Sequence, residues 1–243
     1  MKMPVVVTLL ILSVNPALAE PSGGASEAAT TATWYAPKWL LDAPHAPVFQ
    51  VRDTLHKYGR YADKTKAITL KDLIKFHGHL CGGLVEASVA LKVGFDVLFP
   101  DGVVDRTDLR VVSSNSACGG DTAAYLTGAR TRFGTHYIDK SFKGGDFIVQ
   151  RVSTGKTVRV RRNPAIYPAE VKAQMKKIQS GKFTSEDIDR FGTLQWGYAR
   201  RLVQKPPAES FIVKEVSNYQ WPQPPCQDLG RRTDNDYKAV PAK

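Results

Sequence analysis

The segment from His77 to Gly83 constrains this chain more than any other, because it gathers reactive side chains in a glycine-rich stretch. Two of the five histidines and one of the three cysteines stand at positions 77, 79 and 81, beside glycines at 78, 82 and 83. Residues two apart in an extended segment point to the same side, so His77, His79 and Cys81 could converge on one point. The glycines allow the backbone to turn tightly there. Since imidazole and thiolate bind zinc and other transition metals, the segment indicates a metal site.

A second cysteine lies where a predicted strand passes into a predicted helix. We expect a strand over residues 108–113, a glycine turn over 115–121 and a helix through 122–129. The N–H groups and the dipole at a helix start stabilise a thiolate, which suits Cys118 for metal binding or nucleophilic chemistry. Asp121 could act as a base, as a partner of a metal ligand or as a plain helix cap. The two loops are expected to fold toward each other around one ion, bound by His77, His79, Cys81 and Cys118.

Three blocks of the sequence have the order and spacing of a known family. The blocks are His77-Gly78-His79-Leu80-Cys81-x-Gly83, Asn115-x-Ala117-Cys118-Gly119-x-Asp121 with Leu126-Thr127-Gly128, and Arg151-x-x-Thr154-Gly155-Lys156-x-Val158-Arg159-Val160. Over residues 68–165 the chain resembles the FmdE family, named for formylmethanofuran dehydrogenase operons. The resemblance implies an α+β core domain, usually dimeric, with a groove around the His and Cys motifs. It also implies the same four site residues, with Asp121 as a further candidate.

The chain departs from that family pattern in three ways. Many members have a proline after the first cysteine, where this chain has Gly82. Many carry a C-terminal zinc finger, whereas residues 166–243 hold only Cys226. An export signal at the N-terminus argues against a role inside a cytoplasmic complex. We therefore expect an exported variant without the zinc finger.

The N-terminus is typical of an export signal. Lys2 precedes an apolar stretch from Val5 to Val14, and Ala17-Leu18-Ala19 matches a signal peptidase site. This predicts a signal peptide over residues 1–19, cleavage after Ala19 and a periplasmic mature protein; the alternative is an uncleaved anchor. The apolar stretch is shorter than the roughly 20 residues of a membrane-spanning helix. No later stretch is predicted to cross a bilayer.

The formal net charge of +11 favours anionic partners. We expect an anionic small molecule or an acidic protein, and a membrane surface is a third option. Nucleic acid is not expected, because the chain is exported and shows no zinc-finger, aromatic-basic or helix-turn-helix pattern. The charge is spread out, with a modest peak over residues 159–162, and most of it is expected to be solvated surface.

The domain prediction has four parts. Residues 1–19 form the signal peptide, residues 20–50 form a flexible leader and an arm rich in aromatic residues and proline, and residues 51–165 form the metal-binding core. Residues 166–243 form a helical extension, a strand and a proline-rich tail that pack on the core. Strands and helices do not alternate regularly, so the predicted fold class is α+β. The predicted elements include a short helix around residues 55–61, a capped helix from Thr69, a hairpin over 147–161, a helix between Pro168 and Gly181, a capped helix from Thr184 and a strand over 211–213.

The chemistry of the site stays open at this point. Two thiolates and two imidazoles suit zinc best, with copper and iron as alternatives. Three ligands would leave a position for water or substrate. A Cys81–Cys118 disulfide, or redox cycling between the two states, would explain the cysteines differently. Glu86 and Lys156 are further candidates beside the site, each with a plain interpretation as a solvated or turn residue.

Three functions follow from these alternatives. The first is an exported accessory protein that handles metal or supports a metal- or molybdenum-dependent oxidoreductase. The second is a small periplasmic metalloenzyme acting on an anionic substrate. The third is a disulfide-stabilised interaction protein. The first is preferred, because no clear general acid or base accompanies the ligands.

Overall fold

The computed structural model describes residues 31–224 and 227–241. The predicted signal peptide, its cleavage site, residues 20–30 of the predicted leader and Cys226 lie outside the described residues. The helices are α2 (Lys38–Leu41), α3 (Leu70–His77), α4 (Gly82–Leu98), α5 (Ala117–Thr127), α6 (Ala169–Gln179), α7 (Ser185–Gln204) and α8 (Pro207–Ser210). The strands are β1 (Phe49–Arg52), β2 (Thr54–His56), β3 (Gly59–Tyr61), β4 (Lys66–Ile68), β5 (Val103–Asp105), β6 (Leu109–Ser114), β7 (His136–Asp139), β8 (Phe147–Arg151), β9 (Thr157–Arg162) and β10 (Phe211–Glu215).

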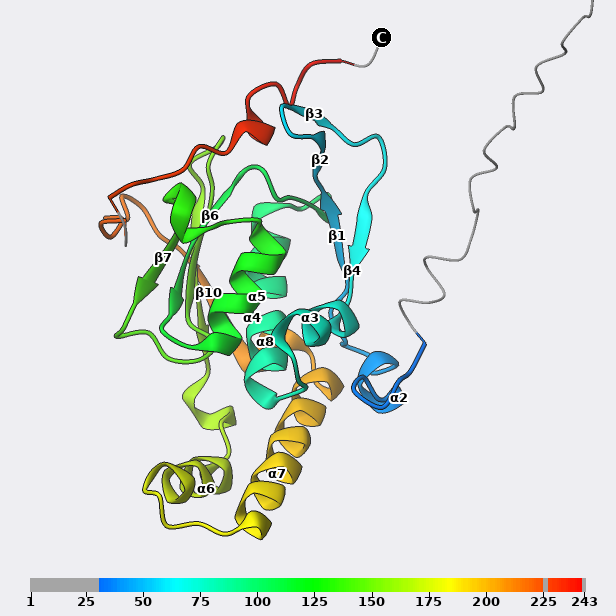
Figure 1. The fold of residues 1–243 in the computed structure, drawn as a ribbon, viewed down its shortest axis with the longest axis vertical. Coiled ribbons are helices and arrows are strands. Elements are labelled where there is room, and N and C mark those ends of the chain that lie inside the picture. The colour runs from blue at the N-terminus through cyan, green and yellow to red at the C-terminus, as the bar shows by residue number, and fades with distance from the viewer. Residues whose placement is uncertain (1–30, 225–226, 242–243) are drawn as a thin grey trace, which may run out of the picture.

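The main sheet has five strands in the order β10-β9-β8-β6-β7 (Figure 1). The predicted hairpin is confirmed as the antiparallel pair β8 and β9, in which Val149 lies opposite Val158. β10 pairs antiparallel with β9, and β7 pairs parallel with β6. The segment after residue 165 therefore adds an edge strand to the core sheet. The mixed sheet with helices packed beside it confirms the α+β class.

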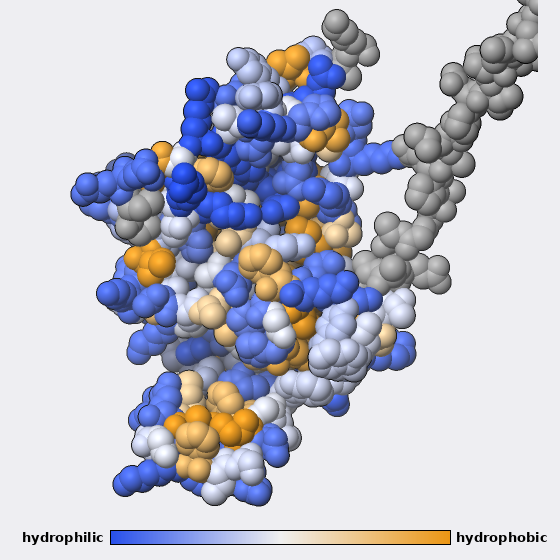
Figure 2. Space-filling model, viewed as in Figure 1, coloured by the Kyte–Doolittle hydropathy of each residue, from blue (hydrophilic) through white to orange (hydrophobic). Residues whose placement is uncertain are grey.

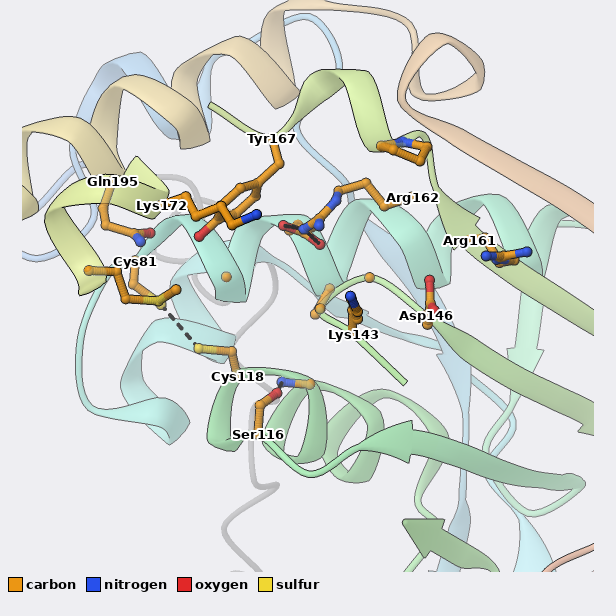
Figure 3. Close-up of a pocket in the computed structure, with 18 of the residues that line it drawn as sticks. Cys81, Ser116, Cys118, Lys143, Asp146, Arg161, Arg162, Tyr167, Lys172 and Gln195 are labelled. Atoms are coloured by element: carbon orange, nitrogen blue, oxygen red, sulfur yellow. Dashed lines mark hydrogen bonds and ion pairs between the residues drawn. The ribbon is translucent and has the colours of Figure 1, made fainter. Parts of the chain in front are cut away.

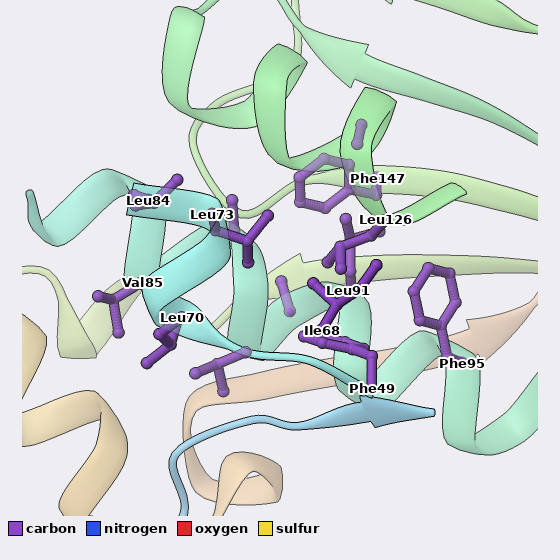
Figure 4. Packing of buried hydrophobic residues seen from close by; sticks show 14 of the residues in the cluster. Phe49, Ile68, Leu70, Leu73, Leu84, Val85, Leu91, Phe95, Leu126 and Phe147 are labelled. Carbon is purple, nitrogen blue, oxygen red and sulfur yellow. The ribbon is translucent and has the colours of Figure 1, made fainter. Parts of the chain in front are cut away.

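Helix α4 is the centre of the hydrophobic core. It contacts the main sheet, α3, α5 and α7, which is why its sequence is apolar on nearly every face. Leu84, Leu91 and Phe95 on α4 are almost fully buried. In Figure 4 they lie among side chains from the rest of the fold, including Leu126 of α5 and Phe147 of β8. Burying each such side chain contributes about 1.5–3 kcal/mol, so this packing fixes the two ends of α4.

A smaller sheet, in the order β4-β1-β5, lies beside the N-terminal part of the core. The helix predicted around residues 55–61 is wrong: β2 and β3 form a hairpin there. Gly59 and Arg60 have positive φ angles of 108° and 67°, which a helix does not allow. Leu55 is 53% exposed and Tyr58 is 57% exposed, so their helix-like spacing does not mark a buried face.

Helices α6 and α7 form a helical pair at one end of the molecule (Figure 1). The predicted capping box is confirmed, since the Thr184 N–H donates to Asp187 Oδ2 at 3.0 Å. α7 also packs along α4 and carries the buried Tyr198 against it. Within the described ranges, no helix is both long enough and apolar enough to cross a membrane.

Candidate metal centre and its pocket

The first motif is a helix–turn–helix junction. α3 begins with the predicted cap, in which the Thr69 N–H donates to Asp72 Oδ2 at 2.9 Å, and ends at His77. Gly78 caps the C-terminus in the left-handed conformation, with φ of 96°. Cys81 is the N-cap of α4, and its sulfur accepts the Leu84 N–H at 3.4 Å. The expected extended loop is therefore wrong, and a helix end, a turn and a helix start bring the side chains together.

Cys118 stands in the first turn of α5, next to the start of α4. Its Sγ lies 3.4 Å from Cys81 Sγ, and both cysteines are free thiols. This approach depends on Gly83, because a Cβ at that position would lie only 2.9 Å from Cys118 Sγ. The first turns of both helices thus face one another, with their N–H groups and positive dipole ends directed at the sulfurs.

His77 joins the two sulfurs to Asp121. Its Nε2 lies 3.8 Å from Cys81 Sγ and 3.7 Å from Cys118 Sγ. Its Nδ1 lies 2.7 Å from Asp121 Oδ2, and the imidazole is only 3% exposed. A carboxylate on one ring nitrogen fixes the tautomer and directs the other nitrogen, as in carboxylate–histidine–metal arrangements. Asp121 therefore lies where a partner of a metal ligand is needed.

His79 completes the group on its solvent side. Its ring lies 4.6 Å from that of His77, centroid to centroid. The potential ligand atoms of His77, His79 and Cys81 all lie within 4.8 Å of one another. Ligand atoms around a tetrahedral zinc lie about 3.4–3.8 Å apart, given bonds of about 2.3 Å to sulfur and 2.0–2.1 Å to nitrogen. The sulfur–sulfur and sulfur–His77 distances match this range, so the residues present fit a zinc-like ion.

The two thiols share one proton strongly. Cys118 donates its S–H to Cys81, which, with the Leu84 N–H and the nearby imidazoles, lowers the pKa of Cys81 to about 5. The same hydrogen bond, together with burial and the Cys81 charge, raises the pKa of Cys118. At neutral pH the pair therefore carries one thiolate, on Cys81, and one thiol.

The sulfurs form one side of a pocket of about 890 Å³. Figure 3 shows Cys81 and Cys118 on that side, with Arg161 and Asp146 toward the opposite side. The wall is made by the start of α4, the start of α5, the β7–β8 connection, the end of β9 and helices α6 and α7. Its charged side chains are Glu86, Lys143, Asp146, Arg159, Arg161, Arg162 and Lys172.

Glu86 lines this pocket as one half of a buried ion pair. It is 2% exposed, accepts two hydrogen bonds from Arg162 Nη1 at 2.8 and 3.0 Å, and accepts one from the Tyr198 hydroxyl at 2.8 Å. Burial raises the pKa of Glu86, while the Arg162 charge opposes that shift. The solvated helix carboxylate considered from the sequence is therefore wrong, and its oxygens are engaged away from the thiols.

The structure does not bring Lys156 to this site. Its Nζ lies 2.9 Å from Glu215 Oε1 and donates to the Val97 carbonyl oxygen at 3.3 Å. Val97 belongs to the C-terminal turn of α4, about 24 Å along the helix from Cys81. The β8–β9 turn that carries Lys156 points to the end of the molecule opposite the cysteines.

Sequence patterns do not reveal most of the pocket wall. Lys143, Tyr167, Lys172 and Gln195 line it, and none lies in a recognisable motif. The one signal in the sequence is the basic peak over residues 159–162, part of which lines the pocket instead of lying on open surface. Gln195 also explains Gly82, whose N–H donates to Gln195 Oε1 at 2.7 Å. A proline at position 82 would remove that donor.

The fold and the clustered thiols and imidazoles define an α+β protein with a candidate metal centre in a basic pocket. A model of the family described as "FmdE, Molybdenum formylmethanofuran dehydrogenase operon" matches residues 76–212. This match spans more than half of the chain, and the protein belongs to the FmdE family. It also runs past the predicted core boundary at residue 165, through α6 and α7 and into β10.

The comparison with solved structures gives a protein of related description. It is an FmdE-like protein of tungsten formylmethanofuran dehydrogenase from Syntrophus aciditrophicus, with 16% sequence identity and a TM-score of 0.38. The alignment covers 63% of this chain and 74% of the other. No curated protein matches this chain.

Proposed function

We propose that this protein binds one transition metal ion, zinc in the first place, through His77, His79, Cys81 and Cys118. The observation that carries the proposal is the spacing of three of the four donors: each sulfur lies 3.4–3.8 Å from the other sulfur and from His77 Nε2. Mixed nitrogen and sulfur donors at tetrahedral spacing suit zinc, with copper(I) as the alternative for soft ligands. A bound ion would supply Lewis-acid character to the pocket.

The residues themselves prepare the site for a cation. Cys81 is already a thiolate at neutral pH, because its pKa is about 5. Asp121 keeps the proton of His77 on Nδ1, which leaves the Nε2 lone pair directed toward the sulfurs. His79 is exposed, so it could bind or leave the ion without repacking of the core. These features support a site that takes up and releases metal, as an exported accessory protein would need.

Elemental analysis of the protein purified from the periplasm tests this function. We expect about one equivalent of metal in the wild type, and loss of that metal in Cys118→Ser and His79→Ala variants. His56→Ala is the matched control, because His56 is exposed on β2, away from the cysteines. Retention of metal in both site variants would reject the assignment.

A second candidate function is supported by the pocket. Because Cys81, Cys118 and His79 line a space of about 890 Å³, an ion held there by three ligands would face a small molecule. This is the arrangement of a metalloenzyme acting on an anionic substrate. Cobalt-substituted protein distinguishes the two functions. A change of its visible spectrum on adding a small anion would favour the open site, and an unchanged spectrum would favour the closed, accessory site.

The disulfide alternative has a direct test. The 3.4 Å between the two sulfurs is longer than the roughly 2.05 Å of a disulfide, and both cysteines are free thiols here. Thiol titration of the denatured, unreduced protein counts the free cysteines. A missing pair would support the interaction protein instead.

Export and dimer formation are part of the proposal. Fractionation of cells that express the full chain should place the mature protein, starting at Glu20, in the periplasm. The predicted homodimer stays a prediction. Figure 2 shows apolar surface at the end of the molecule formed by α6 and α7, where Phe183 is 47% exposed. Sedimentation of wild type and Phe183→Ser would measure whether that end holds two copies together.

A further inference from the structure

The pocket wall has more positive than negative side chains. The cations are Lys143, Arg159, Arg161, Arg162 and Lys172, whereas the carboxylates are Glu86 and Asp146. Among the residues that the structure describes, the one ion pair within this wall joins Arg162 to Glu86, with Nη1 2.8 Å from Oε1. Beyond that pair, four cations face a single carboxylate. Like charges gathered in a hollow raise the local concentration of anions.

Arg162 is held rigidly in the wall. Glu86 anchors one end of its guanidinium group, and its Cζ lies 4.4 Å from the centroid of the Tyr167 ring. Arg162 Nε is buried and has no hydrogen-bond partner, and the same holds for Arg159 Nε. A buried donor without a partner costs free energy, so these groups leave room for an acceptor that is not part of the chain.

The remaining cations come from different elements around the same space. Lys143 lies in the β7–β8 connection, Arg161 near the end of β9 and Lys172 on α6. All three are exposed, so their charged groups are free to meet a ligand as it enters. In Figure 3, Lys143 and Arg161 lie on the side of the pocket away from Cys81, and Lys172 lies beside Tyr167. The basic wall is therefore distinct from the thiols, although both line one pocket.

The same pocket has an apolar surface. Tyr167, Met175 and Phe191 line it, from the segment before α6, from α6 and from α7. The volume of about 890 Å³ is within the range of about 300–1,000 Å³ that small-molecule sites have, and it exceeds what an inorganic anion fills. The ligand must therefore have an organic part as well as its charges.

We propose that the pocket binds an organic anion with two or more negative charges, as carboxylate or phosphate groups. The charges bind at Lys143, Arg161 and Lys172, and the organic part packs against the apolar surface. The rest of the ligand points toward Cys81 and Cys118. The inference extends the proposed function and rests on it only for what the ligand meets at the thiol side.

Calorimetric titration with two model anions tests the proposal. The probes are benzene-1,3,5-tricarboxylate and phenyl phosphate, with neutral 1,3,5-benzenetrimethanol as the control ligand. We expect one or both anions to bind, more weakly as salt is raised, and the neutral compound not to bind. Binding of the tricarboxylate alone or of the phosphate alone supports the proposal and assigns the charged group. Failure of both anions, or equal binding of the neutral compound, overturns it.

Matched variants locate the binding. Lys143→Gln/Lys172→Gln removes two exposed charges and should weaken anion binding by about tenfold or more. Lys57→Gln removes an equally exposed charge on the β2–β3 turn and should leave anion binding unchanged. Wild-type affinity in the double variant contradicts the proposal.

The same preparations separate this inference from the metal proposal. Metal content of the double variant should equal that of the wild type, and Cys118→Ser should lose metal yet still bind the anion. A wild type that binds the anion but holds no metal would overturn the proposed function alone. A wild type that holds metal but binds neither anion would overturn this inference alone.

Discussion

Cys81 Sγ and Cys118 Sγ lie 3.4 Å apart, although 37 positions separate the two residues in the sequence. The contact exists because α4 and α5 pack with their first turns side by side, and Gly83 leaves room for the second sulfur. Neither sulfur is in a disulfide, and both lie within 3.8 Å of His77 Nε2. The predictions below depend on this arrangement.

Removing the Asp121 carboxylate should weaken metal binding. Asp121→Ala leaves His77 Nδ1 without its partner at 2.7 Å, so the ring loses its fixed tautomer and orientation. We expect the metal affinity to fall by about 10–100-fold, measured by competition with a chromophoric chelator. Asp63→Ala, on an exposed turn, is the control. Equal affinity in both variants would show that His77 does not bind through Nε2.

A methyl group at position 83 should disturb the site, whereas one at position 120 should not. The Cβ of Gly83→Ala would lie 2.9 Å from Cys118 Sγ, which forces the two helices or the sulfur to move. Gly120→Ala meets nothing within 4 Å, and in a helix it should raise stability by up to about 1 kcal/mol. Metal content and thermal unfolding of the two variants provide the comparison. A Gly83→Ala protein with full metal content would contradict the observed packing of α4 and α5.

Cys81 should be the reactive thiol of the metal-free protein. Its pKa of about 5 makes it a thiolate at pH 6, whereas the pKa of Cys118 is raised. Brief alkylation with iodoacetamide at pH 6, followed by peptide mass mapping, should therefore label Cys81 ahead of Cys118. Added zinc should protect both cysteines. Preferential labelling of Cys118 would reverse the assignment of the thiolate.

Acid should destabilise the fold through His136. Burial, with a smaller contribution from Arg130, lowers the pKa of His136 to about 4, and Ser113 Oγ lies 2.9 Å from its Nε2. The unfolded chain takes up this proton near pH 6.5 and the folded chain only near pH 4, so stability from this group is complete above pH 6.5 and is lost as pH falls toward 4. Between pH 7 and pH 5 we expect a loss of about 2 kcal/mol.

Urea unfolding at both pH values measures this loss. His136→Gln cannot titrate, so its stability should change less than that of the wild type over the same interval. An equal change in wild type and variant would show that other groups cause the acid sensitivity.

The parts of the fold that local chemistry controls were predictable from the sequence. The caps at Thr69 and Thr184 each use an aspartate three residues on, and the Thr154-Gly155 turn joins two short strands; all three are visible in a few adjacent residues. The two cysteine motifs were equally local, and their side chains do lie together. Long-range partners were not predictable. Glu86 meets Arg162 76 residues later, and Lys156 meets Glu215 instead of the site.

The errors have physical causes as well. Leu55 and Tyr58 are spaced as on a helix, yet both are exposed on a hairpin whose turn requires positive φ angles. His77, His79 and Cys81 were expected to converge from an extended segment, but Gly78 ends α3 between the two histidines. Periodicity alone does not distinguish these cases, because burial decides them and burial depends on residues far away in the sequence.

X-ray absorption at the zinc edge tests the central claim most directly. The protein, purified as expressed and loaded with zinc, should show two sulfur ligands at about 2.3 Å and two nitrogen ligands at about 2.0 Å. Cys118→Ser should lose one sulfur. A spectrum with only oxygen and nitrogen ligands, or one unchanged by that substitution, would contradict a site shared by the two cysteines.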